Sequence, residues 1–214
     1  MGKGETYSAE DIRALIEASV SLTSELTLDT VLQKVVDVAR GQIGARYAAL
    51  SVLNGEGGIQ RFVTSGITEE ERAAIGDVPL GHGLLSVLLH AGTTLRMDDL
   101  TQDPRSAGFP PNHPPMKSLL GVSVISRGRI IGNLYLTEKE GATGFDGRDE
   151  DLLRLLSTQA AVAITNAQLY EKLESLARLE ERDRIGMDLH DGVIQSIYAV
   201  GLNLEDVFGR LPES

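Results

Sequence analysis

The protein has 214 residues, of which 42% are hydrophobic and 24% are charged, and its formal net charge is -11 at pH 7. This composition is typical of a folded, soluble chain with one core domain and an appended element. The acidic balance argues against nucleic-acid binding, which needs clustered Lys and Arg, and the absence of cysteine excludes disulfides, thiolate metal ligands and a cysteine nucleophile.

The N-terminal segment, residues 1–24, is expected to form a separate helix. Ser8 offers a hydroxyl cap, Asp11 follows three residues later, and apolar residues recur at helical spacing from Ile12 to Ile16. The segment lacks the apolar core of a signal peptide, and no run approaches the ~18 apolar residues that a membrane-spanning helix needs. Its start, "MGKGET", fits the loose myristoylation pattern, which we interpret as a chance match. We therefore expect a cytoplasmic protein without membrane insertion.

The central part of the chain, residues 25–166, combines helical and strand-like patterns. A helix is predicted after Thr27, with Gly41 as its stop. Four strand-like runs follow in two hairpins, one joined by "NGEGG" and one by "RGR". The strands are expected at residues 46–53, 60–67, 118–126 and 130–139, with short helices at 68–76 and 83–92 between the hairpins. This order predicts an α+β domain with an antiparallel sheet and flanking helices.

A single long helix is predicted from about Asp146 to Gly209. Roughly 60 residues at 1.5 Å each make a rod of roughly 95 Å, which a domain of this size cannot bury along its whole length. The rod divides into a connecting helix at 146–180 and a further segment at 181–214. Leucine and valine recur at the three-and-four spacing of a two-helix seam, at Leu152, Leu155, Val162, Leu169, Leu173 and Leu176.

Pairing of two copies is expected through the N-terminal and C-terminal helices, which predicts a parallel homodimer. Two charged pairs at i,i+4 spacing, Glu174 with Arg178 and Glu180 with Arg184, are expected on the exposed side of the rod. The alternative is a helix that folds back over its own domain.

The stretch "RIGMDLHDGVIQ" places a histidine at the edge of an apolar helix face. Ile185, Leu189 and Val193 lie on that face, and His190 lies beside it with Asp191 turned further toward solvent. A reachable imidazole next to a carboxylate meets the needs of a nucleophilic histidine. A surface histidine beside an ordinary aspartate is the alternative that geometry leaves open.

Residues 181–205, "ERDRIGMDLHDGVIQSIYAVGLNLE", closely resemble the first helix of the dimerisation and phosphoacceptor domain of two-component sensor histidine kinases. The resemblance implies that His190 takes the γ-phosphoryl group of ATP and passes it to a response regulator. It implies that Asp191 is the general base, and that Gln195 orients water for dephosphorylation of the regulator. The family also needs a second helix and a domain that binds ATP and Mg²⁺, and the 214 residues include neither. We therefore expect the sensor portion of a kinase, inactive by itself.

The loop "DPRSAGFPPNHPPMKSLLGVSV" contains a histidine among prolines. Pro111, Pro114 and Pro115 predict that His113 sits on a stiff, extended segment, which suits either a packed loop or a metal ligand. Zinc is not expected, because the other histidines, His82, His90 and His190, show no ligand spacing. One axial ligand is enough for haem.

The order of helices, antiparallel strands and long loop resembles a GAF domain, a small-ligand sensor. "GFPPNHPPM", "LLGVSV" and "GNLYLTEK" are similar to the haem-bearing GAF domain of dormancy-type oxygen, NO and CO sensor kinases, although Ser123 stands where those have proline. The resemblance implies haem as cofactor, a diatomic gas as ligand, His113 as the proximal ligand and Tyr135 on the distal side. Tyr135 alternates with Ile131, Asn133 and Thr137 on one strand face. The alternatives are a GAF domain that binds another small molecule, such as a cyclic nucleotide, and a non-catalytic dimeric binding module.

Overall fold

The computed structural model describes residues 27–76, 94–106 and 108–209. The helices predicted at residues 1–24 and 83–92 lie outside the described residues, as do His82 and His90. Within the C-terminal helix, the side chains of Asp188, Leu189 and Asp191 and those of residues 195–209 are also not described.

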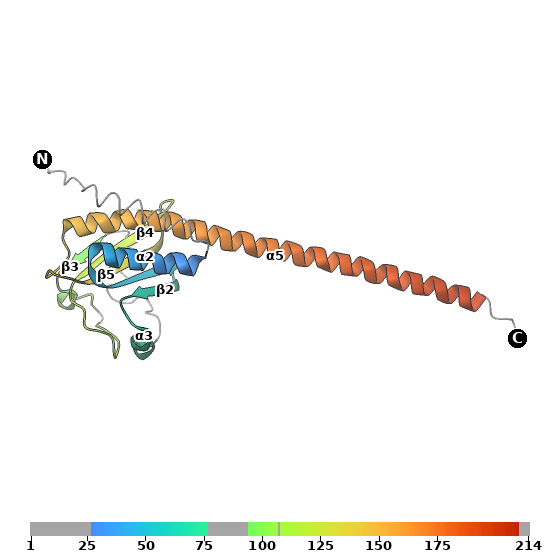
Figure 1. Ribbon diagram of the computed structural model, residues 1–214, viewed down its shortest axis with the longest axis horizontal. Coiled ribbons are helices and arrows are strands. Elements are labelled where there is room, and N and C mark those ends of the chain that lie inside the picture. The colour runs from blue at the N-terminus through green and yellow to red at the C-terminus, as the bar shows by residue number, and fades with distance from the viewer. Residues whose placement is uncertain (1–26, 77–93, 107, 210–214) are drawn as a thin grey trace. The chain divides into compact units, whose positions relative to one another are not determined.

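The described elements form a five-stranded antiparallel sheet with helices beside it (Figure 1). The strand order is β2-β1-β5-β4-β3, so the two sequence hairpins meet where β1 pairs with β5. Along the chain the elements are α2 (Leu28–Ile43), β1 (Ala45–Leu53), β2 (Ile59–Ser65), α3 (Glu69–Ile75), β3 (Leu95–Met97), the 3-10 turn η1 (Leu100–Gln102), β4 (Leu119–Ser126), β5 (Arg129–Lys139) and α5 (Gly147–Gly209). The predicted α+β fold with a long C-terminal helix is confirmed.

The two predicted hairpin turns are present. In the first, the side-chain oxygen of Asn54 accepts the backbone N–H groups of Glu56 and Gly58 at 3.0 and 2.8 Å. In the second, Arg127 and Gly128 both have positive φ, 51° and 75°, as a two-residue hairpin turn of type I′ requires. Local sequence therefore fixes the pairing of β1 with β2 and of β4 with β5.

Helix α2 ends later along the chain than predicted. The helix continues through Gly41 to Ile43, and Gly44 adopts a left-handed conformation at φ 69° with its N–H bonded to the carbonyl of Arg40. Gly41 was the wrong stop because the buried stripe of α2 extends to Ile43, and burial of that side chain outweighs the low helix propensity of one glycine.

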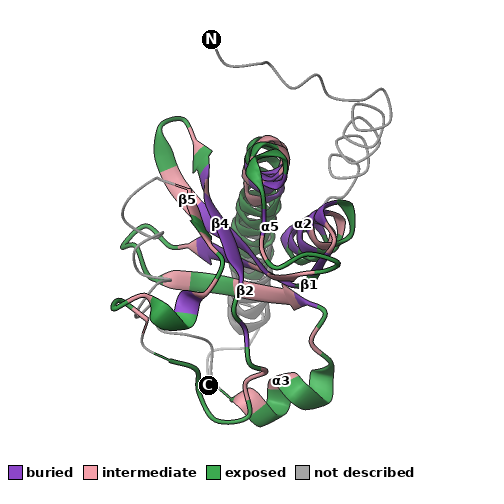
Figure 2. Ribbon diagram, turned by 90° about the vertical axis from the view of Figure 1, so that its left-hand side faces the viewer, coloured by how far each residue is buried: buried purple, intermediate pink, exposed green. Residues whose placement is uncertain are grey.

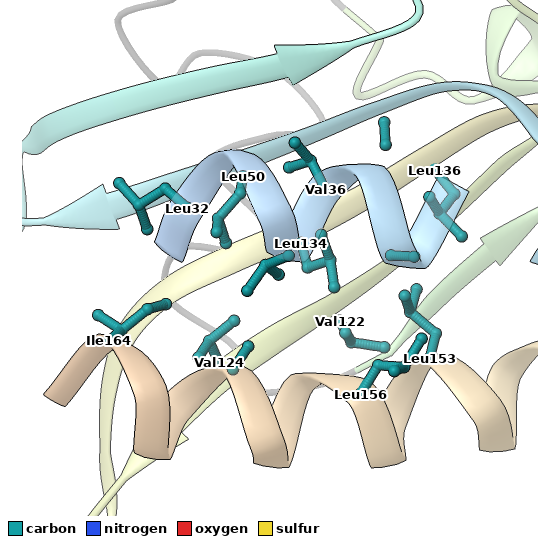
Figure 3. Packing of buried hydrophobic residues seen from close by; sticks show 14 of the residues in the cluster. Leu32, Val36, Leu50, Val122, Val124, Leu134, Leu136, Leu153, Leu156 and Ile164 are labelled. Atoms are coloured by element: carbon teal, nitrogen blue, oxygen red, sulfur yellow. The ribbon is translucent and has the colours of Figure 1, made fainter. Parts of the chain in front are cut away.

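The main hydrophobic core lies between one face of the sheet and the two helices α2 and α5. Figure 2 shows the buried sides of both helices turned toward the strands. Leu32 and Val36 of α2 and Leu153 and Ile164 of α5 belong to the same core as Leu134 in the middle of β5 (Figure 3). We call this side of the sheet the helix-covered face.

The opposite face carries a second, smaller cluster made by Tyr47, Leu100, Met116, Leu119 and Tyr135. We call it the loop face, because Met116 from the loop at residues 104–118 packs on it. Along β5, Asn133, Tyr135 and Thr137 lie on the loop face, as predicted. Ile131 does not, and packs instead against the core of the helix-covered face. The pairing register of β4 and β5 shifts between Val124 and Ile125, and this irregularity breaks the alternation there.

Helix α5 has 63 residues, as the sequence predicted. By internal contacts the chain divides into two units, residues 1–168 and 169–214, so the first third of α5 belongs to the sheet domain. Leu152, the first residue of the predicted seam, is partly buried and packs against that domain's own core. None of the described helices is long and apolar enough to cross a membrane.

Candidate functional site

The loop face brings buried polar groups together in the centre of the sheet. Strand pairing places Ser51 of β1 opposite Asn133 of β5, and Asn133 opposite Ser123 of β4. Ser51 and Asn133 are completely buried. Buried polar side chains need hydrogen-bond partners, so a row of them at the centre of the sheet makes the loop face a candidate binding surface.

Tyr135 lies in the next row, between two small residues. Ala49 of β1 and Gly121 of β4 pair with it on either side. Burial raises the pKa of the Tyr135 phenol to about 12, and the nearby Ser51 hydroxyl lowers it by less. The phenol is therefore a neutral hydrogen-bond donor at physiological pH. The Ser51 hydroxyl is the hydrogen-bonding group that acts on this phenol, from the neighbouring strand β1.

The loop at residues 104–118 holds His113 at the end of a tight turn. The N–H of His113 donates to the carbonyl of Pro110 at 3.2 Å, and Asn112 between them has a φ of 64°. Pro111 and Asn112 thus take the central positions of a type II turn, which favours proline first and a residue of positive φ second. The sequence predicted an extended segment around His113, and the structure places a tight turn immediately before it, because Asn112 tolerates the left-handed conformation.

The His113 ring is oriented by two contacts. Its Nδ1 lies 2.8 Å from the carbonyl oxygen of Pro114, and the ring stacks on Phe109 with centroids 4.7 Å apart. A carbonyl can only accept, so Nδ1 carries the proton and donates it. Nε2 then keeps its lone pair, which is the tautomer of a histidine that binds a metal through Nε2.

The loop is tied to the sheet domain on both sides of His113. The Asn112 amide donates to the carbonyl of Ala74 in α3 at 2.9 Å. Met116 is buried on the loop face, where its sulfur accepts the Thr137 hydroxyl at 3.1 Å. Glu138, at φ 58°, turns its carboxylate to the N–H groups that follow Met116 in the chain. His113 is therefore held by a segment that is fixed, at Met116 and beyond, to the strand of Tyr135.

His113 and Tyr135 share no hydrogen bond in the part of the chain that the structure describes. They are linked through Met116, which belongs to the same cluster as Tyr135. Sequence reasoning singled out both residues but missed Ser51. The sequence feature that could have indicated Ser51 is a serine within the otherwise apolar run "YAALSVL". Ser51 lies four residues after Tyr47, and therefore on the same face of the strand, the loop face.

A separate open groove of about 690 Å³ lies at the β2 edge of the sheet. It is lined by α2, β2 and α3, with Gln33, Arg40 and Arg72 among its polar residues. The Ser65 hydroxyl donates to Asp37 there at 2.5 Å. The groove includes neither His113 nor Tyr135, so it is distinct from the loop face.

The C-terminal unit carries the predicted phosphoacceptor residues on one helix. His190 is exposed, and Asp191 and Gln195 follow it in the same helical run. Arg184 forms a bidentate pair with Glu181, at 2.7 and 2.9 Å, whereas the sequence predicted Glu180 as its partner. The predicted pair of Glu174 with Arg178 is present at 2.5 Å.

Comparison with protein families decides the nature of the sheet domain. The family model described as "GAF domain" matches residues 25–165, which span the sheet, α2, the loop and the first part of α5. The chain belongs to the GAF family.

Known GAF proteins resemble this chain at low sequence identity. The GAF domain of a phosphoenolpyruvate-protein phosphotransferase from Acinetobacter is 20% identical with a TM-score of 0.62, covering 76% of this chain and 97% of that one. The GAF domain of a putative sensor histidine kinase from Pseudomonas syringae pv. tomato is 19% identical with a TM-score of 0.53, covering 78% and 93%. At these identities the structures establish the fold alone.

Among curated proteins, the chain resembles a probable 3',5'-cyclic phosphodiesterase, pde-5, from Caenorhabditis elegans. The two are 20% identical over 192 residues, which is 82% of this chain and 25% of the phosphodiesterase. The chain therefore spans about a quarter of that relative's length.

The described residues of this GAF domain offer one oriented imidazole rather than a cluster of metal ligands. They contain no group of three or more His, Asp or Glu placed to share one ion. His113, by contrast, is a single oriented imidazole with a free lone pair at Nε2, as one-ligand haem attachment requires. Tyr135 offers a neutral donor on the loop face.

Proposed function

We propose that this chain is the sensor portion of a two-component histidine kinase, and that its GAF domain senses a diatomic gas or a redox state through haem. The observation that supports the haem proposal is the hydrogen bond from His113 Nδ1 to the Pro114 carbonyl, which leaves the Nε2 lone pair available for an iron. Haem supplies an iron centre that binds a diatomic gas reversibly. His113 would hold the haem iron through Nε2, and the Tyr135 phenol would supply a hydrogen-bond donor to the bound gas.

The signal leaves the domain through contacts at the end of β5. Glu138 binds the backbone of the His113 loop, and the next residue, Lys139, binds Asp149 in the first turn of α5 at 2.8 Å. A shift of the loop therefore acts on Glu138 and on its neighbour Lys139, and Lys139 holds the start of α5. Since α5 continues to His190, we propose that a small displacement of this helix changes access to His190.

The phosphoryl step follows from the resemblance of residues 181–205 to phosphoacceptor helices. A nitrogen of His190 attacks the γ-phosphorus of ATP bound with Mg²⁺ in a catalytic domain. The bond to ADP breaks, and Asp191 accepts the imidazole proton. His190 then transfers the phosphoryl group to an aspartate of the response regulator, and Gln195 orients water for its later hydrolysis. The exposure of His190 supports this role.

Two copies pair through the exposed apolar residues of α5. Leu169, Leu173 and Leu176 are 50%, 61% and 48% exposed, and they share one side of the helix. Leucines this exposed on one helical stripe are typical of a coiled-coil seam. We propose a parallel homodimer, in which both copies of His190 lie on paired helices.

A hemin titration tests the sensing proposal. Purified protein is mixed with hemin, reduced and exposed to CO, and its absorption is recorded at each stage. A Soret band that shifts on reduction and again on CO binding supports haem sensing. Lack of a band would contradict it and would favour a soluble ligand. The cyclic phosphodiesterase relative makes a cyclic nucleotide the first to titrate in that case.

Phosphotransfer tests the kinase proposal separately. The chain is incubated with labelled ATP and a histidine-kinase catalytic domain, and acid-labile phosphate is measured on wild type and on His190→Gln. Labelling that the variant loses supports the phosphoacceptor role. Equal labelling of both, or no labelling of either, would contradict it and would favour a non-catalytic dimeric binding module.

A further inference from the structure

The groove at the β2 edge of the sheet contains a guanidinium nitrogen that lacks a hydrogen-bond partner. Arg40 of α2 and Arg72 of α3 both line the groove. Arg40 Nε is buried, and it donates to none of the described groups. Neither arginine forms an ion pair with an acidic side chain in the part of the chain that the structure describes. Because a buried N–H of a charged group costs free energy until it finds an acceptor, the groove suits a ligand that supplies one.

Two carboxylates share the groove with these arginines. Asp37 and Glu69 both line it, and both are exposed. Asp37 is held in place, because its Oδ1 accepts the Ser65 hydroxyl at 2.5 Å and the Gln33 amide at 3.3 Å. A carboxylate has more acceptor positions than these two bonds occupy, so Asp37 can accept a further N–H. Two arginines and two acids give the lining a formal charge of zero.

We propose that this groove binds a zwitterion, an amino acid, at a site separate from the proposed haem site. Arg40 and Arg72 bind the carboxylate of the ligand, which supplies the acceptor that Arg40 Nε lacks, and Asp37 binds its ammonium group. A ligand with several negative charges, such as a nucleotide, fits less well, because Asp37 and Glu69 repel it. The groove volume of about 690 Å³ is typical of small-molecule sites.

Binding at Arg40 acts on the end of α2 that is joined to α5. Arg40 lies in the last turn of α2, three residues before Ile43. The Ile43 carbonyl accepts Lys139 Nζ at 2.6 Å, and the same Nζ binds Asp149 of α5 at 2.8 Å. An amino acid in the groove therefore contacts the helix that Lys139 connects to the start of α5, which makes it a second input to α5.

Binding to the intact chain tests the site. Each of the common amino acids is added to the purified protein without hemin, and the one that raises the Tm most is titrated by calorimetry. Its analogues without the ammonium group and without the carboxylate are titrated as well, and inorganic phosphate is the anion control. The variants are Arg40→Gln and Asp37→Asn. Arg61→Gln is the matched control, because Arg61 lies on β2 outside the groove lining and pairs with Asp29.

We expect wild type to bind the amino acid about tenfold more tightly than either analogue, the range of one charge-assisted hydrogen bond. Arg40→Gln should remove the preference over the analogue without the carboxylate. Asp37→Asn should remove the preference over the analogue without the ammonium group, and Arg61→Gln should bind as wild type does. The comparison of analogues in wild type needs no variant, so it decides the question even if a substitution disturbs folding.

Four results would overturn the inference. Lack of binding by every amino acid up to about 10 mM would exclude the site. Equal affinity for the amino acid and its analogue without the ammonium group, or tighter binding of phosphate, would make the groove a simple anion site. Unchanged affinity in both Arg40→Gln and Asp37→Asn would place the ligand elsewhere. Equal weakening by Arg61→Gln would indicate a general effect of charge. The haem function is independent of all four, because no residue of the proposed haem site lines the groove.

Discussion

Lys139 Nζ lies 2.8 Å from Asp149 Oδ1 and 2.6 Å from the carbonyl oxygen of Ile43, so one side chain joins the end of β5 to the start of α5 and the end of α2. Asp149 in turn exchanges hydrogen bonds with Asp146, each carboxylate accepting the other residue's N–H. The first turn of α5 is thus fixed to the strand that carries Tyr135.

Breaking this junction should destabilise the domain. Lys139→Met leaves the largely buried Asp149 carboxylate without its cation, and we expect a loss of about 1–3 kcal/mol in unfolding free energy, measured in urea. The control is Arg154→Ala, which removes an exposed ion pair with Glu150 and should cost less than ~1 kcal/mol. Equal effects of the two variants would contradict a special role for Lys139.

Substitution of two glycines by alanine should change the stability of the protein in opposite directions. Gly66 has a φ of 90°, and a Cβ there would overlap the carbonyl oxygen of Arg46, so Gly66→Ala should cost at least about 2 kcal/mol. Gly41 lies inside α2, where an added Cβ would meet nothing within 4 Å, so Gly41→Ala should stabilise the protein by about 0.5–1 kcal/mol. Thermal unfolding distinguishes the two, and a stabilised Gly66→Ala would contradict the close approach to Arg46.

The Tyr135 phenol should ionise at a higher pH than an ordinary tyrosine, and the free energy of unfolding should therefore fall in alkaline solution. Its pKa of about 12 in the folded state exceeds the ordinary value near 10. The unfolded chain therefore loses this proton first, and stability falls as the pH rises from about 10 to about 12, by roughly 2–3 kcal/mol in total. Absorbance near 295 nm should show one of the five tyrosines ionising last. If Tyr135→Phe keeps this late step, another tyrosine is responsible.

The helix seam is testable with two exposed residues of α5. Leu173 lies on the stripe with Leu169 and Leu176, whereas Ser175 is also exposed but lies ~100° or more around the helix from each of these three leucines. Leu173→Glu should weaken dimerisation at least tenfold, because it places like charges within the seam. Ser175→Glu should leave it unchanged. Light scattering across a dilution series measures both, and a monomeric wild type at micromolar concentration would refute the dimer.

Sequence patterns predicted most of the fold because the signals were local. Turn residues marked both hairpins, and helical spacing marked α2 and α5. The short strand β3, Leu95–Met97, was missed, because three residues carry no alternation and only pairing with β4 makes them a strand. The prediction that Ile131 lies on the same face as Tyr135 was wrong for a related reason. The register shift that moves Ile131 depends on the pairing of β5 with β4.

The candidate site was predicted in part. Motif resemblance singled out His113 and Tyr135, but the turn at Asn112 and the hydrogen bond of His113 Nδ1 are properties of the folded loop. Ser51 had no motif, and its importance depends on which strand face it occupies. The roles of His190 and of the Asp and Gln that follow it on the helix remain predictions from the sequence.

The most direct measurement for the central claim is the visible spectrum of hemin-treated protein for wild type, His113→Ala and the control His190→Ala. We predict a Soret band with one haem per chain in wild type and in the control. His113→Ala should lack this band or bind less than one haem per chain. Added imidazole should restore the axial ligand in the variant. Equal haem binding and identical spectra in all three proteins would contradict the assignment of His113, and no binding in any of them would contradict haem sensing itself.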